Sequence, residues 1–323
     1  MNTIFTTIHS HTKTGMKLIA TKWLIVIAAC LISPMTAQAQ STVKFKGGGE
    51  MYYEDSGGSG DVVLFLHGHT LDRRMWDGQV AVLKDNYRIV VPDLRGYGKS
   101  SDPEEGYQFT HADDVIALMD SLGIDRAHVV GLSLGAYVAG DLVALFPNRL
   151  LSCVMVSGET CTFAGPGKPR SANDIADRRK NIAQVKNNVN AYKQRRVRGL
   201  LNACHPANRD KIHPELTREI MDWGAWQALH VPARVYYGEQ AWAQLKSHKS
   251  DVPSLIIYGA SERTSKGYSL PYLTDGKLIQ FKQCGHMVNL EQPEKFNNTL
   301  VKWLKEHSNS ATETLERQQL NPK

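Results

Sequence analysis

Residues Gly131-Leu-Ser-Leu-Gly135 match the pattern G-x-S-x-G and directly follow the apolar run Ala-His-Val-Val at 127–130. A stretch rich in Ala, Val and Leu, 136–145, comes after them and has the composition of a helix. Between a strand and a helix, this pattern predicts a very tight turn that holds the backbone of Ser133 under strain and exposes its hydroxyl. Side chains at the two glycine positions would collide with neighbouring backbone. The N–H of Leu134 would be left free to stabilise an oxyanion.

Strand-like apolar runs alternate with helix-like segments on both sides of this turn. The expected elements are helices at 114–122 and 294–307 and strands at 62–66, 87–91, 127–130, 153–156, 254–258 and 277–281. Such alternation is typical of an α/β fold with a mostly parallel sheet and helices on both faces. The length of 323 residues, 42 % of them hydrophobic, fits one domain or one domain with an insertion.

Residues 160–250 interrupt the alternation. They are rich in polar, basic and aromatic residues, with helices expected at 172–189, 191–201 and 213–229. We interpret them as a helical cap inserted into an α/β domain of residues 40–308. The polar tail 309–323 is expected to be disordered.

The first 39 residues have the pattern of a secretory signal peptide. Three lysines and no acidic residue accompany the apolar run 23–32, and the small residues Ala37 and Ala39 fit a cleavage site. Ten apolar residues are too few to cross a bilayer, so no stable membrane span is expected. A start at Met16 and lipoprotein cleavage at Cys30 are alternatives. The expected location is the periplasm or the outside of the cell.

Removing residues 1–39 lowers the formal net charge from +6 to +3, because it leaves 35 basic and 32 acidic residues. This balance gives no reason to expect nucleic acid binding. The basic run 193–198 is expected to be a solvated helix face. The alternative is a patch that attracts an anionic substrate or a membrane surface.

The cysteines allow two interpretations once export is expected. Four remain after residue 39, and they could pair in three ways. A bridge between Cys161 and Cys204 would close the insertion and stabilise it by roughly 3–4 kcal/mol. Reduced and mostly buried thiols are an equally good alternative. The four are Cys153, Cys161, Cys204 and Cys284.

Further motifs make residues 43–307 resemble the α/β-hydrolase family, in particular its small esterases, lactonases and proline iminopeptidase-like enzymes. In the family's order they are Leu66-His-Gly-His-Thr70, Trp76, Pro92-Asp-Leu-Arg-Gly-Tyr-Gly-Lys-Ser100, the G-x-S-x-G turn, residues 253–262 and Cys284-Gly-His286. The resemblance implies the α/β-hydrolase fold and a catalytic triad. It implies no metal or organic cofactor.

A serine needs a base to become a nucleophile, and a histidine base needs an acid to hold its tautomer. The expected chain order is serine, acid, histidine, and Ser133 and His286 fit its two ends. The family places the acid three residues after the glycine that closes a strand. That glycine is Gly259, so the acid is Glu262, where Asp is more common. Glu159, just past the preceding strand, is the alternative.

The resemblance also implies that the backbone N–H groups of His69 and Leu134 form the oxyanion hole. Asp93 and Arg95 are expected to brace the loop beneath the site, and His67 is expected to be structural.

The remaining residues of interest fall into two groups. The scattered histidines have no metal-ligand spacing, so no metal site is expected. The aromatic residues after 220 either line an apolar substrate pocket or form the core of the cap. These residues are His205, His213, His230 and His248, and Trp223, Trp226, Tyr236, Tyr237 and Trp242.

These features predict an exported serine hydrolase that cleaves a small carboxylic ester or lactone through an acyl-enzyme on Ser133. An aminopeptidase, a carbon–carbon bond hydrolase and a lipase are alternatives with similar chemistry. A non-catalytic ligand-binding protein on the same scaffold is an alternative of another class. Epoxide hydrolase and haloalkane dehalogenase activities are disfavoured, because relatives with those activities have an aspartate at the position of Ser133.

Overall fold

The computed structural model describes residues 39–104, 107–160, 172–230 and 235–308. The chain separates into Met1–Ala37 and one compact unit, Gln38–Lys323. The expected signal peptide, apart from its last residue, and the expected disordered tail therefore lie outside the described residues. Cys161 lies outside them too, and with it the expected pairing with Cys204.

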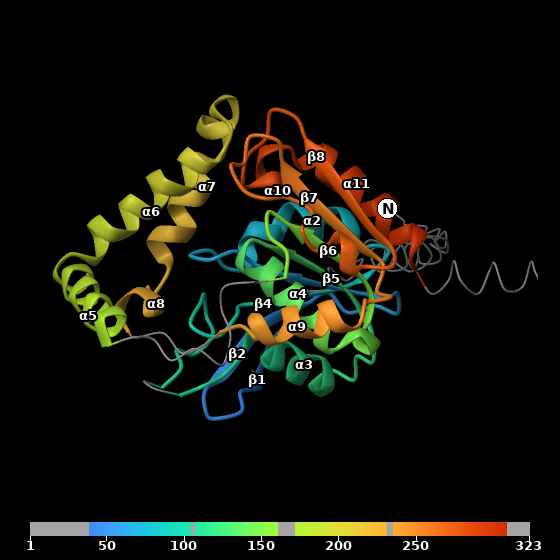
Figure 1. The fold of residues 1–323 in the computed structure, drawn as a ribbon, viewed down its shortest axis with the longest axis horizontal. Coiled ribbons are helices and arrows are strands. Elements are labelled where there is room, and N and C mark those ends of the chain that lie inside the picture. Colours follow the sequence, from blue (N-terminus) through green and yellow to red (C-terminus); the bar gives the residue numbers. More distant parts are fainter. Residues whose placement is uncertain (1–38, 105–106, 161–171, 231–234, 309–323) are drawn as a thin grey trace, which may run out of the picture. The chain divides into compact units, whose positions relative to one another are not determined.

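A sheet of eight strands forms the centre of the unit (Figure 1). Its order is β1-β2-β4-β3-β5-β6-β7-β8; β1 and β2 run antiparallel to their neighbours and the other pairs are parallel. This is the mostly parallel sheet that the sequence predicts, with two N-terminal strands that it does not. The strands are β1(Ala39–Lys44), β2(Glu50–Asp55), β3(Val62–Leu66), β4(Arg88–Pro92), β5(Ala127–Leu132), β6(Leu150–Val156), β7(Ser254–Gly259) and β8(Gly276–Phe281).

Helices cover both faces of the sheet. α3, α4 and α9 pack on one face, and α2, α10 and α11 pack on the other. The helices are α2(Asp77–Leu83), α3(His111–Ser121), α4(Leu134–Leu145), α5(Ala172–Asn187), α6(Val189–Ala203), α7(Arg209–Asp222), α8(Trp226–Leu229), α9(Glu239–Ser247), α10(Val288–Glu291) and α11(Pro293–Glu306). None of the helices within the described ranges is long and apolar enough to cross a membrane.

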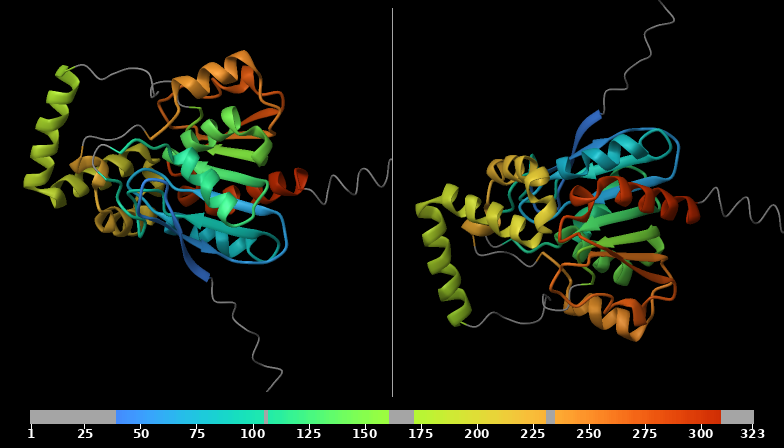
Figure 2. Two further views of the ribbon diagram at one scale, coloured as in Figure 1. Left: turned by 90° about the horizontal axis from the view of Figure 1, so that it is seen from below. Right: turned by 90° about the horizontal axis from the view of Figure 1, so that it is seen from above.

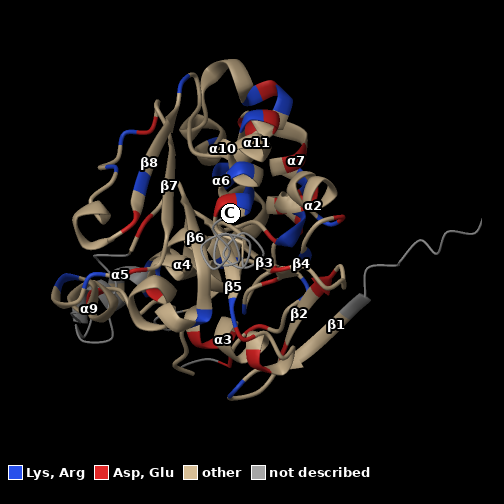
Figure 3. Ribbon diagram, turned by 90° about the vertical axis from the view of Figure 1, so that its right-hand side faces the viewer, with Lys and Arg blue, Asp and Glu red and all other residues tan. Residues whose placement is uncertain are grey.

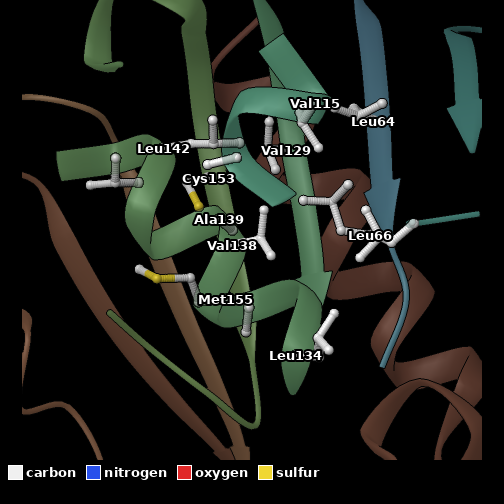
Figure 4. Close-up of a cluster of buried hydrophobic side chains, with 14 of the residues drawn as sticks. Leu64, Leu66, Val115, Val129, Leu134, Val138, Ala139, Leu142, Cys153 and Met155 are labelled. Atoms are coloured by element: carbon white, nitrogen blue, oxygen red, sulfur yellow. The ribbon is translucent and has the colours of Figure 1, made fainter. Parts of the chain in front are cut away.

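The central strands are buried on both faces, so they are apolar at every position rather than at alternate ones. β5, β6 and β7 contain no charged residue, as Figure 3 shows. Side chains of alternate residues enter the two cores. Val129 of β5 packs with Val138 and Leu142 of α4 (Figure 4), whereas Val130 packs in the core that contains Trp303 of α11.

The helices between β6 and β7 divide into two groups. α5, α6, α7 and α8, which we call the cap helices, lie at the edge where the parallel strands end (Figure 2). α9 instead packs against α4, and Ala241 and Leu245 belong to the core on that face. The expected insertion 160–250 thus includes one helix that supports the sheet.

The prediction of one continuous helix at 213–229 is wrong, because the structure has two helices there. α7 begins at Arg209, with Pro214 inside it, and ends at Asp222. The helix is interrupted before α8, because Ala225 adopts the left-handed conformation, with φ 62°. The sequence offers Gly224 as a signal for this break, but the apolar periodicity continues across it.

Candidate active site

The turn between β5 and α4 has the geometry that its sequence predicts. Ser133 stands between the two elements with φ 55° and ψ −107°, in a region that costs a non-glycine residue about 1–3 kcal/mol. A Cβ atom at Gly131 would fall on the carbonyl of Gly135, and one at Gly135 would fall on the carbonyl of Leu66. The backbone N–H of Ser133 donates to Val156 on β6, 2.8 Å away. Neighbouring backbone therefore fixes the strained serine.

Glu262 and His286 form a hydrogen-bonded pair. Nδ1 of His286 lies 2.9 Å from Oε2 of Glu262, whose side chain is 7 % exposed. The other carboxylate oxygen, Oε1, accepts from the Ser157 hydroxyl at 2.8 Å and from the Gly259 N–H at 3.0 Å. Because Nδ1–H donates to a carboxylate, Nε2 of His286 is the ring nitrogen that can accept a proton.

Glu159 has a different set of partners. It is fully buried, and its two carboxylate oxygens accept from the N–H groups of Gly267 and Ser269 at 2.6 and 2.8 Å. These bonds hold the segment between β7 and β8. The geometry therefore favours Glu262 over Glu159 as the partner of His286.

The two expected oxyanion donors lie at the ends of neighbouring elements. Leu134 is the first residue of α4, so its N–H has no partner within the helix. His69 lies in the loop after β3, next to Thr70 with φ 71°, and its Nδ1 is 2.6 Å from the Tyr97 hydroxyl. Within the described residues, the Ser133 hydroxyl itself makes no hydrogen bond. Its link to His286 therefore belongs to the proposal below.

Three polar residues of the loop motifs, His67, Asp93 and Arg95, make buried contacts that fit the structural roles expected for them. His67 is fully buried; its Nε2 accepts from Leu94 N–H at 2.9 Å, and its Nδ1 lies 2.9 Å from the Gly68 carbonyl. Burial lowers the pKa of His67, which agrees with a neutral ring. Asp93 binds the Arg73 guanidinium at 3.0 Å, and Arg95 pairs with the Asp114 carboxylate at 2.6 Å.

The loop that carries His286 is bonded to the turn between α6 and α7. The backbone N–H of His286 donates to the carbonyl of Ala203, 3.1 Å away. Glu291, 3 % exposed, accepts from the N–H groups of Gly285 and His205 at 2.9 Å. Its carboxylate thus joins the histidine loop to the cap helices. Sequence reasoning missed both Glu291 and Ser157, since neither belongs to a motif.

The aromatic residues after 220 do not form one lining. Trp223 is close to the candidate oxyanion loop: its ring is 5.2 Å from the ring of His69 and stacks on Tyr97 at 6.3 Å. The others pack apart from these two rings. Trp226 stacks on His230, Trp242 contacts Tyr268 and Tyr272, Tyr237 bonds to Asp113, and Tyr236 contacts His111 and Tyr137.

A cavity of about 590 Å³ lies beside the acid–base pair. Glu262 and His286 line it, together with Arg209 from the start of α7 and Arg263 from the loop after β7. The pair is therefore open to a space of small-molecule size.

The described residues hold no group of three or more His, Cys, Asp or Glu side chains that could bind a metal ion. Cys153, Cys204 and Cys284 are free and buried. Burial raises the pKa of the Cys284 thiol to about 12, so this thiol is protonated at neutral pH.

Comparisons with known proteins agree with the fold. The sequence model of the "Alpha/beta hydrolase family" matches residues 63–299. The bifunctional esterase/perhydrolase of Acinetobacter calcoaceticus is 28 % identical over 287 residues, which cover 81 % of this chain and 99 % of that protein. A thermophilic esterase from Thermogutta terrifontis, solved with malate bound, is similar with a TM-score of 0.65 and 25 % identity; the match covers 84 % of this chain and 99 % of that one. Est816, an N-acyl homoserine lactone degrading enzyme, is similar with a TM-score of 0.64 and 25 % identity, and the match covers 81 % of this chain and 99 % of that one.

Proposed function

The chain belongs to the α/β-hydrolase family, and on that premise we propose that it is an exported serine hydrolase that cleaves a carboxylic ester or lactone through an acyl-enzyme on Ser133. The observation that carries the proposal is the strained Ser133 at the end of β5 together with the 2.9 Å contact between His286 and Glu262. An esterase and a lactone-degrading enzyme among the similar proteins support this class of bond.

The proposed reaction has two halves. The Ser133 oxygen attacks the acyl carbon while Nε2 of His286 takes the hydroxyl proton, and Glu262 stabilises the charged imidazole. The oxyanion accepts hydrogen bonds from the N–H groups of His69 and Leu134, each worth about 3–4 kcal/mol in the transition state. His286 then returns its proton to the leaving alcohol. Water, activated by the same histidine, releases the acid and restores Ser133.

Labelling with a fluorophosphonate tests the nucleophile. We expect stoichiometric modification of the purified mature protein, mapped by peptide mass spectrometry to Ser133 and absent from the Ser133→Ala variant. A protein that is folded but takes no label would exclude an activated serine. A panel of esters, lactones, aminoacyl amides and vinylogous diketones would then separate the esterase from the aminopeptidase and the carbon–carbon bond hydrolase.

Export is proposed from residues 1–39 alone, because three lysines, an apolar run and small residues before Gln40 form a signal-like sequence. Expression of the full chain in a bacterium with a periplasm, followed by fractionation and N-terminal sequencing, tests it. We expect a periplasmic or secreted product that begins at Gln40. A cytoplasmic product with an intact N-terminus would exclude export, and a lipid-modified Cys30 would show anchoring instead.

A further inference from the structure

The basic residues at 193–198 of α6 do not share one environment, although the sequence alone suggests a single solvated face. Nζ of Lys193 donates to the carbonyl of Met221 at 2.8 Å. Arg195 and Arg198 are exposed, whereas Arg196 is half-buried and precedes the buried Val197. The structure therefore separates Arg196 from the outer cations of the run.

The guanidinium of Arg196 is incompletely satisfied. Its Nε is buried and has no hydrogen-bond partner, and the described residues provide Arg196 with no ion pair. A buried charged donor without a partner is unfavourable, and an oxygen acceptor supplied by a ligand would remove that cost. The planar guanidinium donates best to a carboxylate, which can accept two parallel bonds.

The position of Arg196 relates it to the candidate oxyanion loop. Tyr192 precedes it by one helical turn, so the two side chains share a face of α6. The Tyr192 ring packs on Trp223 at 6.4 Å, and Trp223 stacks on Tyr97 at 6.3 Å. The Tyr97 hydroxyl in turn contacts His69 at 2.6 Å. Burial raises the pKa of Tyr97 well above its usual value, and the positive charge of Arg196 opposes this shift.

We propose that Arg196 binds a carboxylate of the substrate, so that the preferred ester or lactone is anionic. This inference rests on the proposed hydrolase function and names the class of substrate for the same site. Arg196 holds the substrate rather than taking part in the proton transfers, so its loss weakens binding of anionic substrates and spares neutral ones.

Two matched pairs of esters test the proposal by pH-stat titration. In the first pair, monoethyl adipate carries a carboxylate on the acyl side and ethyl hexanoate is its neutral partner. In the second pair, 6-acetoxyhexanoate carries a carboxylate on the alcohol side and hexyl acetate is its neutral partner. We expect the wild-type enzyme to prefer the anionic member of at least one pair. Arg196→Met should lower kcat/KM for that ester about tenfold, through KM, and leave its neutral partner within about threefold. Arg198→Met, an exposed position on the same helix, should change neither. A wild-type preference for the neutral esters, or an equal loss for both members in Arg196→Met, would overturn the proposal.

A binding measurement separates this proposal from the proposed reaction. Calorimetric titration of adipate into the Ser133→Ala variant needs no turnover. We expect saturable binding that is about tenfold weaker in Ser133→Ala/Arg196→Met. No binding to Ser133→Ala, or undiminished binding to the double variant, refutes the role of Arg196 even if esters are cleaved. If no ester is cleaved but adipate binds through Arg196, the hydrolase function fails and the anion site stands.

Discussion

The hydroxyl of Ser157 lies 2.8 Å from Oε1 of Glu262, the carboxylate oxygen that faces away from His286. Together with the Gly259 N–H, this hydroxyl fixes the direction from which the acid meets the histidine. Glu has one more rotatable bond than the Asp expected from the family pattern. The Ser157 and Gly259 contacts remove that additional freedom.

Replacing Ser157 with alanine should therefore loosen the acid without removing it. We expect kcat to fall about three- to tenfold, because the Glu262 carboxylate loses one of its hydrogen bonds. Fluorophosphonate labelling kinetics and ester turnover measure the change. Ser247→Ala, at an exposed serine on α9, is the control. Unchanged rates in Ser157→Ala would show that Gly259 and His286 alone hold the carboxylate.

Exchange of each candidate acid for its amide should separate their roles. Glu262→Gln is expected to lose about a thousandfold or more in kcat, because the amide cannot stabilise the charged imidazole. Glu159→Gln should keep kcat within about threefold but unfold more readily, since one of its two buried N–H partners would face an amide group at a cost of about 1–3 kcal/mol. Turnover and thermal unfolding of both variants decide this. The reverse pattern would make Glu159 the acid.

The surroundings of Gly131 and Gly199 predict opposite effects of substitution by alanine. Gly131→Ala would place a methyl group on the Gly135 carbonyl, so we expect loss of soluble protein or of activity. Gly199 lies inside α6 with open space around it, and Gly199→Ala should stabilise the protein by about 0.5–1 kcal/mol. Soluble yield and ester turnover measure the first effect, and denaturant unfolding measures the second. A fully active Gly131→Ala protein would contradict the backbone geometry of this turn.

Glu219 on α7 predicts a pH effect on stability. Burial, with a smaller effect from the charge of Asp72, raises its pKa from 4.5 to about 9. Between these values the folded protein keeps a proton that the unfolded chain has lost, so the free energy of unfolding falls as pH rises from 4.5 to 9. Glutamine does not ionise, so the Glu219→Gln variant should not show this fall in the free energy of unfolding.

We expect the melting temperature of Glu219→Gln to exceed that of the wild type by about 5 °C or more at pH 8, and by much less at pH 4.5. Differential scanning fluorimetry across this range provides the measurement. Asp210→Asn, an exposed position at the start of the same helix, should show no such trend. A Glu219→Gln variant that is less stable than the wild type at pH 8 would show that Glu219 is ionised in the folded protein.

The sequence predicts the parts of the fold in which the local pattern and the packing agree. The runs at 62–66 and 254–258 lie in strands β3 and β7 because buried parallel strands need apolar residues throughout. The turn around Ser133 is predicted because its glycines are sterically required. β1 and β2 are not predicted, because the residues of β1, Ala-Gln-Ser-Thr-Val-Lys, are mostly polar, and the short buried run of β2, 51–53, is flanked by charged residues such as Glu50.

The site is predictable where a motif carries it and hidden where only tertiary contacts do. The expected roles of Ser133, Glu262 and His286 come from motifs of the family that the chain resembles. Ser157 and Glu291 act on this group through bonds between distant segments, and nothing in their own neighbourhoods marks them. Arg196 differs from its basic neighbours in having a buried Nε without a hydrogen-bond partner, which depends on how α6 packs.

The bonds around Glu291 have a consequence for protein engineering. The carbonyl of Ala203 and the N–H of His205, at the end of α6 and just after it, bind the same loop that carries His286. The cap helices and the proposed catalytic base, His286, are therefore not independent modules. A chimera that receives the cap helices of another hydrolase must also keep residues 203–208 and Glu291. Without them, we expect the loop that carries His286 to lose its alignment.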